Sequence, residues 1–100
     1  MEDREILALF QRRDQEAIPA LDAQYGGRLR ALAMRLLGSP EDAEECVSDT
    51  YLAAWNAIPP EEPVYLFAYL AAICRNKALS MLGRENAQKR RGELVALTAE

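Results

Sequence analysis

The chain has 100 residues, half of them hydrophobic, and its 12 basic and 16 acidic side chains give a formal net charge of −4. This length suits one domain with a small core, and the negative charge excludes a protein that coats nucleic acid by bulk positive charge, while leaving room for a local basic face. No apolar run is long enough to cross a membrane and the N-terminus lacks a signal-peptide pattern, so we expect a cytoplasmic protein that does not enter the membrane.

Helical periodicity runs through the chain, and no window alternates as a strand would. Residues 3–12 predict a first helix. Asp14 is a candidate N-cap for a long second helix over about residues 15–37, which Pro19 and the Gly26-Gly27 pair are expected to bend or weaken. The sequence therefore predicts an all-α fold, a compact bundle of three to four helices.

The third helix has the clearest start signal. Gly38 suits the position just past the end of the preceding helix. Ser39 suits an N-cap, Pro40 the first helical position and Asp42 the acid of a capping box. The helix that begins here is expected to cover residues 40–57 and to stop before a proline-rich loop.

A fourth helix is expected from about Val64 to Arg84, fraying toward Arg91. We expect residues 1–91 to form one domain and residues 92–100 to be a tail or the start of a linker. Charge changes sign between the third and fourth helices, because an acidic segment without basic residues is followed by a segment with six basic residues and one acidic residue. Such a surface can hold two partners of opposite charge preference.

The third helix has an apolar stripe that suits a core and, opposite to it, an acidic and polar face. That face carries Glu41, Glu45, Ser48, Asp49 and Asn56. Leu52 lies in the middle of it. A single exposed leucine is common on protein surfaces. The other interpretation is a docking surface, in which one apolar anchor ringed by carboxylates receives a basic partner helix.

The fourth helix also has a face that its core does not need. Its expected core stripe is Phe67, Leu70, Cys74, Ala78 and Met81. The far face carries rings, an amide and small residues with a basic border: Tyr65, Tyr69, Ala72, Asn76, Ser80 and Gly83, with Arg75, Lys77 and Arg84. This combination suits single-stranded nucleic acid, since rings stack on bases and cations meet phosphates. Alternatively, the tyrosines pack against a neighbouring helix and the cations are solvated.

No catalytic or metal site is predicted. Cys46 and Cys74 are the only thiols and the chain has no histidine, so a zinc site lacks ligands and the cysteines are interpreted as reduced core thiols. No glycine-rich phosphate loop is present, and the clustered carboxylates are interpreted as solvated charge. We therefore expect no enzyme activity, no cofactor and no metal.

Two segments resemble a known family. Residues 42–55 are similar to the region-2 motif of sigma-70-like RNA polymerase sigma factors, above all those of the small extracytoplasmic-function (ECF) group, and residues 66–79 are similar to the second half of that region. Residues 25–38 also fit, and the resemblance spans roughly residues 5–91. Three positions depart from the usual residues of the family: Tyr69 for Trp, Ser80 for Asp and Gly83 for Arg.

The resemblance implies a helical transcription-initiation domain. Its acidic helix would dock on the coiled coil of the polymerase β′ subunit through Glu41, Glu45, Ser48, Asp49 and Leu52. Its loop and last helix would recognise and melt the −10 promoter element by holding the non-template strand, through Ile58, Pro59, Pro60, Val64, Tyr65, Tyr69, Arg75, Asn76, Lys77 and Arg84. The region-4 helix-turn-helix of the family is not found in this sequence, so we expect one domain of a longer protein or a truncated relative. The alternative is a degenerate sigma-like module that binds polymerase or an anti-sigma factor without opening DNA.

Overall fold

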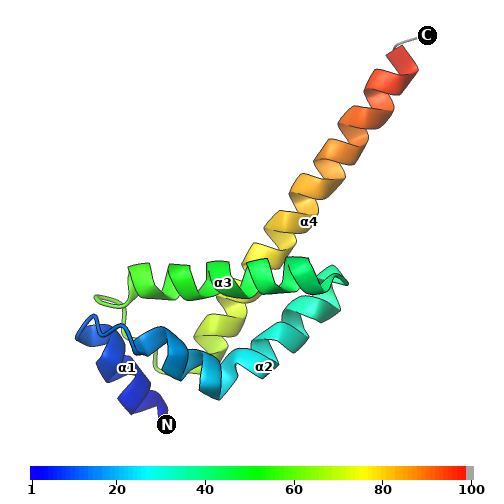
Figure 1. Ribbon diagram of the computed structural model, residues 1–100. Coiled ribbons are helices and arrows are strands. Elements are labelled where there is room, and N and C mark those ends of the chain that lie inside the picture. The colour runs from blue at the N-terminus through cyan, green and yellow to red at the C-terminus, as the bar shows by residue number, and fades with distance from the viewer. Residues whose placement is uncertain (99–100) are drawn as a thin grey trace.

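The computed structural model describes residues 1–98 of the chain, and side chains for residues 1–92. This part of the chain contains helices and no strand, which confirms the predicted all-α fold: α1 (Asp3–Gln11), α2 (Ala17–Leu37), α3 (Pro40–Ala57) and α4 (Leu66–Thr98). Figure 1 shows α2 and α3 running in opposite directions, with the first half of α4 packed against both. The rest of α4 projects from this bundle.

The junction between α2 and α3 follows the local signals of the sequence. Gly38 has a φ of 72°, the left-handed conformation that favours glycine, and its N–H donates to the Met34 carbonyl at 2.8 Å. The Ser39 hydroxyl accepts from the Asp42 N–H at 3.4 Å, and Pro40 occupies the first turn. The predicted bounds of the third helix, residues 40–57, are therefore confirmed at both ends.

The second helix begins slightly later than predicted. The Asp14 carboxylate accepts from the Glu16 N–H at 2.9 Å, so it caps a turn that leads into α2 rather than α2 itself. Pro19 falls in the first turn of α2, where its missing N–H leaves no intrahelical bond unmade. The helix then continues through Gly26-Gly27 to Leu37, and Figure 1 shows it changing direction along its length.

Side chains from all four helices meet in one core. Its largest fully buried members are Phe10, Ile6, Leu21, Leu29, Ile58, Leu66 and Leu70. Of the core stripe expected on the fourth helix, Leu70, Cys74 and Ala78 are buried. Phe67 and Met81 of the same stripe are only partly buried, because they pack against the edge of the core.

A buried cysteine pair joins α3 to α4. Cys46 and Cys74 are free thiols with their Sγ atoms 3.7 Å apart, and the Cys46 thiol donates to the Cys74 carbonyl at 3.3 Å. Burial raises the pKa of Cys46 to about 12, so the thiol stays protonated at neutral pH. The prediction of reduced core thiols is confirmed.

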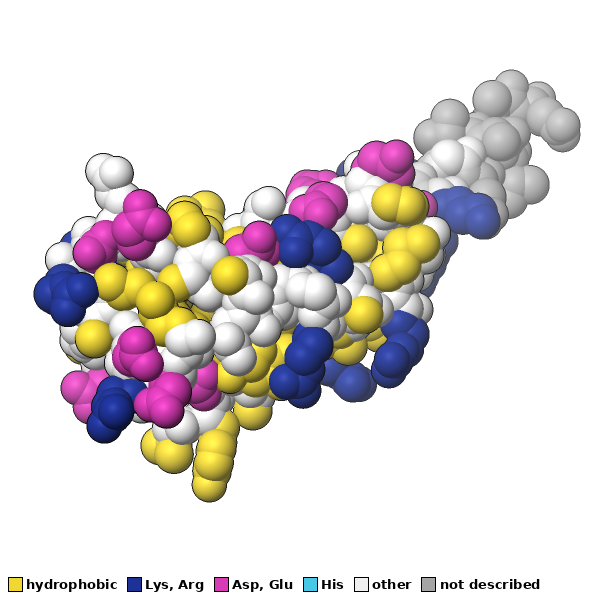
Figure 2. Space-filling view, turned by 60° about the horizontal axis from the view of Figure 1, so that its bottom comes forward, with side chains coloured by type: hydrophobic (Ala, Val, Ile, Leu, Met, Phe, Trp, Pro, Cys, Tyr) yellow, Lys and Arg dark blue, Asp and Glu magenta, His cyan; other side chains and the backbone are white. Residues whose placement is uncertain are grey.

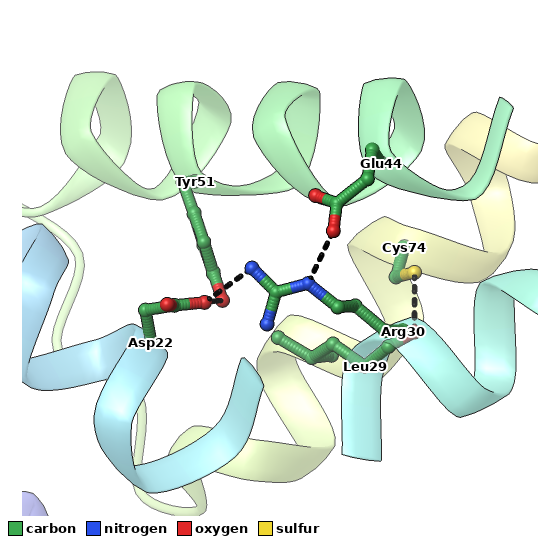
Figure 3. A network of polar contacts seen from close by, with 6 residues as sticks. All are labelled: Asp22, Leu29, Arg30, Glu44, Tyr51 and Cys74. Carbon is green, nitrogen blue, oxygen red and sulfur yellow. Dashed lines mark hydrogen bonds and ion pairs between the residues drawn. The ribbon is translucent and has the colours of Figure 1, made fainter. Parts of the chain in front are cut away.

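A polar network joins α2 to α3 (Figure 3). The Arg30 Nε donates to the Glu44 carboxylate at 2.6 Å, and its Nη2 lies 2.9 Å from Asp22 Oδ1. The Tyr51 hydroxyl donates to the same Asp22 oxygen at 2.6 Å. Gly26 leaves room for this network, because a Cβ there would lie 2.3 Å from Asp22 Oδ1. The pair that looked like a weak point of the helix thus contains a glycine that lies directly beside this network.

The fourth helix is longer than predicted. It was expected to end near Arg84 but continues to Thr98, through Gly92. Residues 83–92 are all exposed, so this half of α4 gains nothing from the core. The division of the chain at residue 91 stays a prediction. None of the helices in the described part is both long and apolar enough to cross a membrane.

Candidate functional site

The outward face of α3 carries the first group of predicted site residues. Glu41, Glu45 and Ser48 are exposed, and Leu52 is 58% exposed in their midst. Asp49 was expected to be exposed as well but is partly buried, because it lies in a groove against α4. The structure therefore places these side chains on one surface with a large apolar side chain at its centre.

Leu52 borders an apolar hollow of about 420 Å³ between the start of α2 and the end of α3. The hollow is lined by Gln15, Ile18, Ser48, Tyr51, Leu52 and Trp55. An exposed leucine beside a hollow can insert into a partner surface while the hollow receives a side chain of the partner. An isolated surface leucine has no such hollow beside it. Sequence reasoning missed Ile18, because it belongs to another helix and joins this surface only in the folded chain.

Trp55 closes one end of this hollow. It is only half-buried, because its ring forms part of the hollow wall. The Arg13 guanidinium lies 3.8 Å from the ring centroid and donates to the carbonyls of Trp55 and Ile58, the latter at 3.1 Å. This cation therefore caps the C-terminus of α3 and fixes the start of the following loop. No local sequence pattern identifies that role.

The loop between α3 and α4 is anchored at one end and open at the other. Ile58 is fully buried, so its side chain anchors the loop and does not present itself to a ligand, as the predicted DNA contact would require. Val64 and Tyr65 are 84% and 77% exposed. The Tyr69 hydroxyl donates to the Glu61 carboxylate, and burial followed by that hydrogen bond raises the pKa of Tyr69 to about 12. Tyr69 thus braces the loop, and Tyr65 is the ring that is free to stack.

The polar residues of α4 are exposed as expected, but not all on the same side of the helix. Lys77, Ser80 and Arg84 line a groove of about 360 Å³ together with residues of α3 that include Asp49 and Leu52. The two predicted surfaces, treated as separate in the sequence, therefore meet along this groove. Arg75 and Asn76 are exposed but do not line it.

Charge is unevenly distributed over the molecule. Figure 2 shows Lys and Arg side chains gathered on the side from which α4 projects, while many of the Asp and Glu side chains lie toward the opposite side. Hydrophobic side chains lie between the cations. Within the described residues, no group of His, Cys, Asp and Glu side chains is arranged to hold a metal ion.

One comparison with known proteins decides the family. The sequence model described as Sigma-70 region 2 matches residues 21–88, most of the chain. The chain belongs to the sigma-70 region 2 family. Domains of this family are non-catalytic parts of transcription factors that act in RNA polymerase binding and promoter recognition, so the sigma-factor resemblance of the sequence is confirmed. Neither the curated proteins nor the solved structures gave a match.

Proposed function

We propose that this sigma region 2 domain belongs to the ECF group, docks on the β′ coiled coil of core RNA polymerase through α3, and holds the non-template strand of the −10 element through its loop and α4. The exposed Leu52 beside the apolar hollow is the observation that carries the proposal. It marks an anchor point, and the exposed carboxylates around it favour a basic partner.

The docking half is tested by binding to a fragment of the β′ coiled coil. Leu52→Ala should weaken binding by about tenfold or more, the usual loss for a central anchor, with unchanged helix content and melting temperature. Leu79→Ala is the matched control, because Leu79 is also exposed, at 47%, but lies on α4 and outside the hollow. Equal effects of the two substitutions would reject α3 as the docking surface.

The DNA half rests on the loop and the start of α4. Three prolines stiffen the loop and lower the entropy cost of ordering it around an unstacked base. Tyr65 offers a free ring, worth about 1–3 kcal/mol per stacked base. The cations of α4 would meet phosphates, and Asn76 is the residue we propose for a specific polar contact.

A fluorescence-anisotropy titration of single strands tests this half. The expected result is tighter binding to a −10-like non-template strand than to a scrambled strand, with Tyr65→Ala losing most of the difference. Equal affinity for the two strands would leave only non-specific charge. No binding at low salt would favour the alternative, a sigma-like module that binds polymerase or an anti-sigma factor without opening DNA.

A further inference from the structure

Arg13 occupies a position where the backbone favours glycine. It follows α1 with a φ of 55°, and in the described part of the chain it is the one residue other than glycine with a positive φ. Its N–H donates to the Phe10 carbonyl at 3.0 Å, and the Asp14 N–H donates to the Leu9 carbonyl at 2.9 Å. These two hydrogen bonds form a helix end that usually has glycine at this position. Residues held in such a conformation cluster at functional sites.

The side chain of Arg13 supplies a hydrogen-bond donor that the loop after α3 lacks. In a continuing helix the Trp55 carbonyl would accept from the N–H of residue 59, but that residue is proline and has no N–H. The Arg13 guanidinium donates to this carbonyl, and also to the Ile58 carbonyl at 3.1 Å. It lies 3.8 Å from the centroid of the Trp55 ring. One planar cation therefore ties the last turn of α3 to the first residue of the loop.

The segment that carries Arg13 is itself fixed in the core. Ile6 and Phe10 of α1 are fully buried, and the Phe10 ring lies 6.0 Å from that of Trp55 between centroids. Both α1 and Arg13 precede residues 21–88, the part of the chain that matches the family model. The contact that holds the loop thus comes from outside the matched residues, and Arg13 was not a predicted site residue.

Two contacts hold the loop between α3 and α4, residues 58–65. Arg13 binds its first residue, and farther along the Tyr69 hydroxyl donates to the Glu61 carboxylate. The exposed Val64 and Tyr65 follow this second contact. The two contacts together fix the path of the loop toward the side chains proposed to meet bases. A loop that is already in its binding conformation binds more tightly, because less ordering is required.

We infer that Arg13 is a positioning residue for base recognition, which holds the loop in the conformation that accepts an unstacked base and does not itself contact DNA. The inference rests on the proposed function and gives α1 a part in it. Because Arg13 is exposed, the competing interpretation is a direct contact with phosphate. The two differ in salt dependence, since a lost phosphate contact lowers the slope of log K against log salt by about 0.7 for a single strand.

The test compares R13Q with R12Q in anisotropy titrations of fluorescein-labelled −10-like and scrambled single strands, using the full 100-residue chain. R12Q is the matched control, because Arg12 is the neighbouring cation and its guanidinium pairs with Asp14 at 3.8 Å. R13Q should reduce the ratio of the two affinities about five- to tenfold, as the fraction of loops in the binding conformation falls. The salt slope should not change. R12Q should leave both the ratio and the slope as in the wild type.

R13G separates positioning from folding. Glycine suits the φ of 55° at this position, so R13G should keep a melting temperature close to that of the wild type while losing selectivity as R13Q does. Amide hydrogen exchange gives a readout that needs no DNA. The Glu61 N–H, which donates to the Ala57 carbonyl at 3.0 Å, should exchange faster in R13G than in the wild type. The amides of α2 should exchange at the wild-type rate.

Each outcome decides for or against Arg13. Selectivity that is retained in R13G rejects the inference at any rate of exchange, while the proposed function stands. A slope lowered by about 0.7 assigns Arg13 to a phosphate and also rejects the inference. Lost selectivity with unchanged exchange of Glu61 would show that Arg13 does not act through the loop. Wild-type binding without selectivity for the −10-like strand rejects both the inference and the proposed function.

Discussion

The two sides of α4 differ in how their cations are compensated. On the side facing α3, Lys77 and Arg84 share their groove with Asp49. On the side facing α2, Arg28 and Arg35 share theirs with no carboxylate. A cation beside a carboxylate attracts phosphate less than an uncompensated one does. The net charge of −4 therefore says little about nucleic-acid binding, because the location of each carboxylate decides it.

The difference follows from the order of the helices. The acidic segment forms α3, so α3 places its carboxylates along one side of α4. Arg30 of α2 pairs with Asp22 and Glu44 in the network at the contact between α2 and α3. Arg28 and Arg35, the other arginines of α2 discussed above, line the furrow between α2 and α4. One helix thus borders a groove of mixed charge on its α3 side and a furrow with cationic side chains on its α2 side.

The largest effect is expected from a substitution in the core that supports both sides of α4. Leu70 is fully buried in α4, so Leu70→Ala should lower the free energy of unfolding by about 2–5 kcal/mol. Leu79→Ala on the same helix removes an equal volume from a side chain that is 47% exposed, and should change stability by no more than about 0.5 kcal/mol. Urea unfolding followed by circular dichroism measures both. Similar losses would mean that α4 is not held by this core.

A smaller effect should separate the two adjacent glycines of α2. An alanine at position 26 would place its Cβ 2.3 Å from Asp22 Oδ1 and 2.5 Å from Arg30 Nη1, whereas at position 27 nothing lies within 4 Å. Gly26→Ala should therefore cost up to about 1 kcal/mol, because the ends of the Asp22 and Arg30 side chains must shift out of the network, and Gly27→Ala should stabilise the helix by up to about 1 kcal/mol. Urea unfolding of the two variants measures these two changes in the free energy of unfolding. The same sign for both would show that the network adjusts freely, and that it does not fix α2 against α3.

Local signals predicted the fold well where they were sufficient. Gly38, Ser39 and Pro40 mark the ends of two helices through backbone conformation and capping, which depend on near neighbours only. The end of α4 was missed because no proline or capping pattern stops it, and neither Gly83 nor Gly92 breaks it. The contact of Arg13 with Trp55 could not be predicted, because the two residues lie more than 40 positions apart in the sequence.

The candidate site shows the same limit. Periodicity on α3 correctly identified Leu52 as exposed among acidic residues, since one helix determines that. It could not tell which neighbour lies beside each cation of α4, because that depends on packing between helices. Arg28 and Arg35 lie on one face of α2 at i and i+7, a signal that was present but that gains meaning only when Phe67 is seen to lie beside it.

Removing one carboxylate would make the two sides more alike. Asp49→Asn should tighten single-strand binding about two- to threefold at low salt, corresponding to about 0.5 kcal/mol for a partly exposed charge. A double-mutant cycle sharpens the comparison: Asp49→Asn should couple to Arg84→Gln, which shares its groove, and not to Arg35→Gln. Coupling to Arg35 of equal size would show that the two sides of α4 act as one surface.

The smallest effect concerns acid stability of the network that holds α2 against α3. The hydrogen bond from Tyr51, with a lesser contribution from Arg30, lowers the pKa of Asp22 below its ordinary value of 3.8, while burial acts against the shift. A lowered folded-state pKa means that ionised Asp22 contributes its full stabilisation above the unfolded-state pKa and loses it as pH falls through the folded-state value.

Asp22→Asn should therefore be less stable than the wild type at neutral pH, and the difference should shrink as pH falls below about 4. Tyr51→Phe removes the strongest cause of the shift, so less stability should be lost on acidification in that variant. Because 40% of the Asp22 side chain is exposed, solvent screens the interaction and the effect should be modest. Urea unfolding at a series of pH values measures it. A difference between wild type and Asp22→Asn that stays constant as the pH is lowered would show that Asp22 titrates as it does in the unfolded chain, and that the network holds the two helices by packing alone.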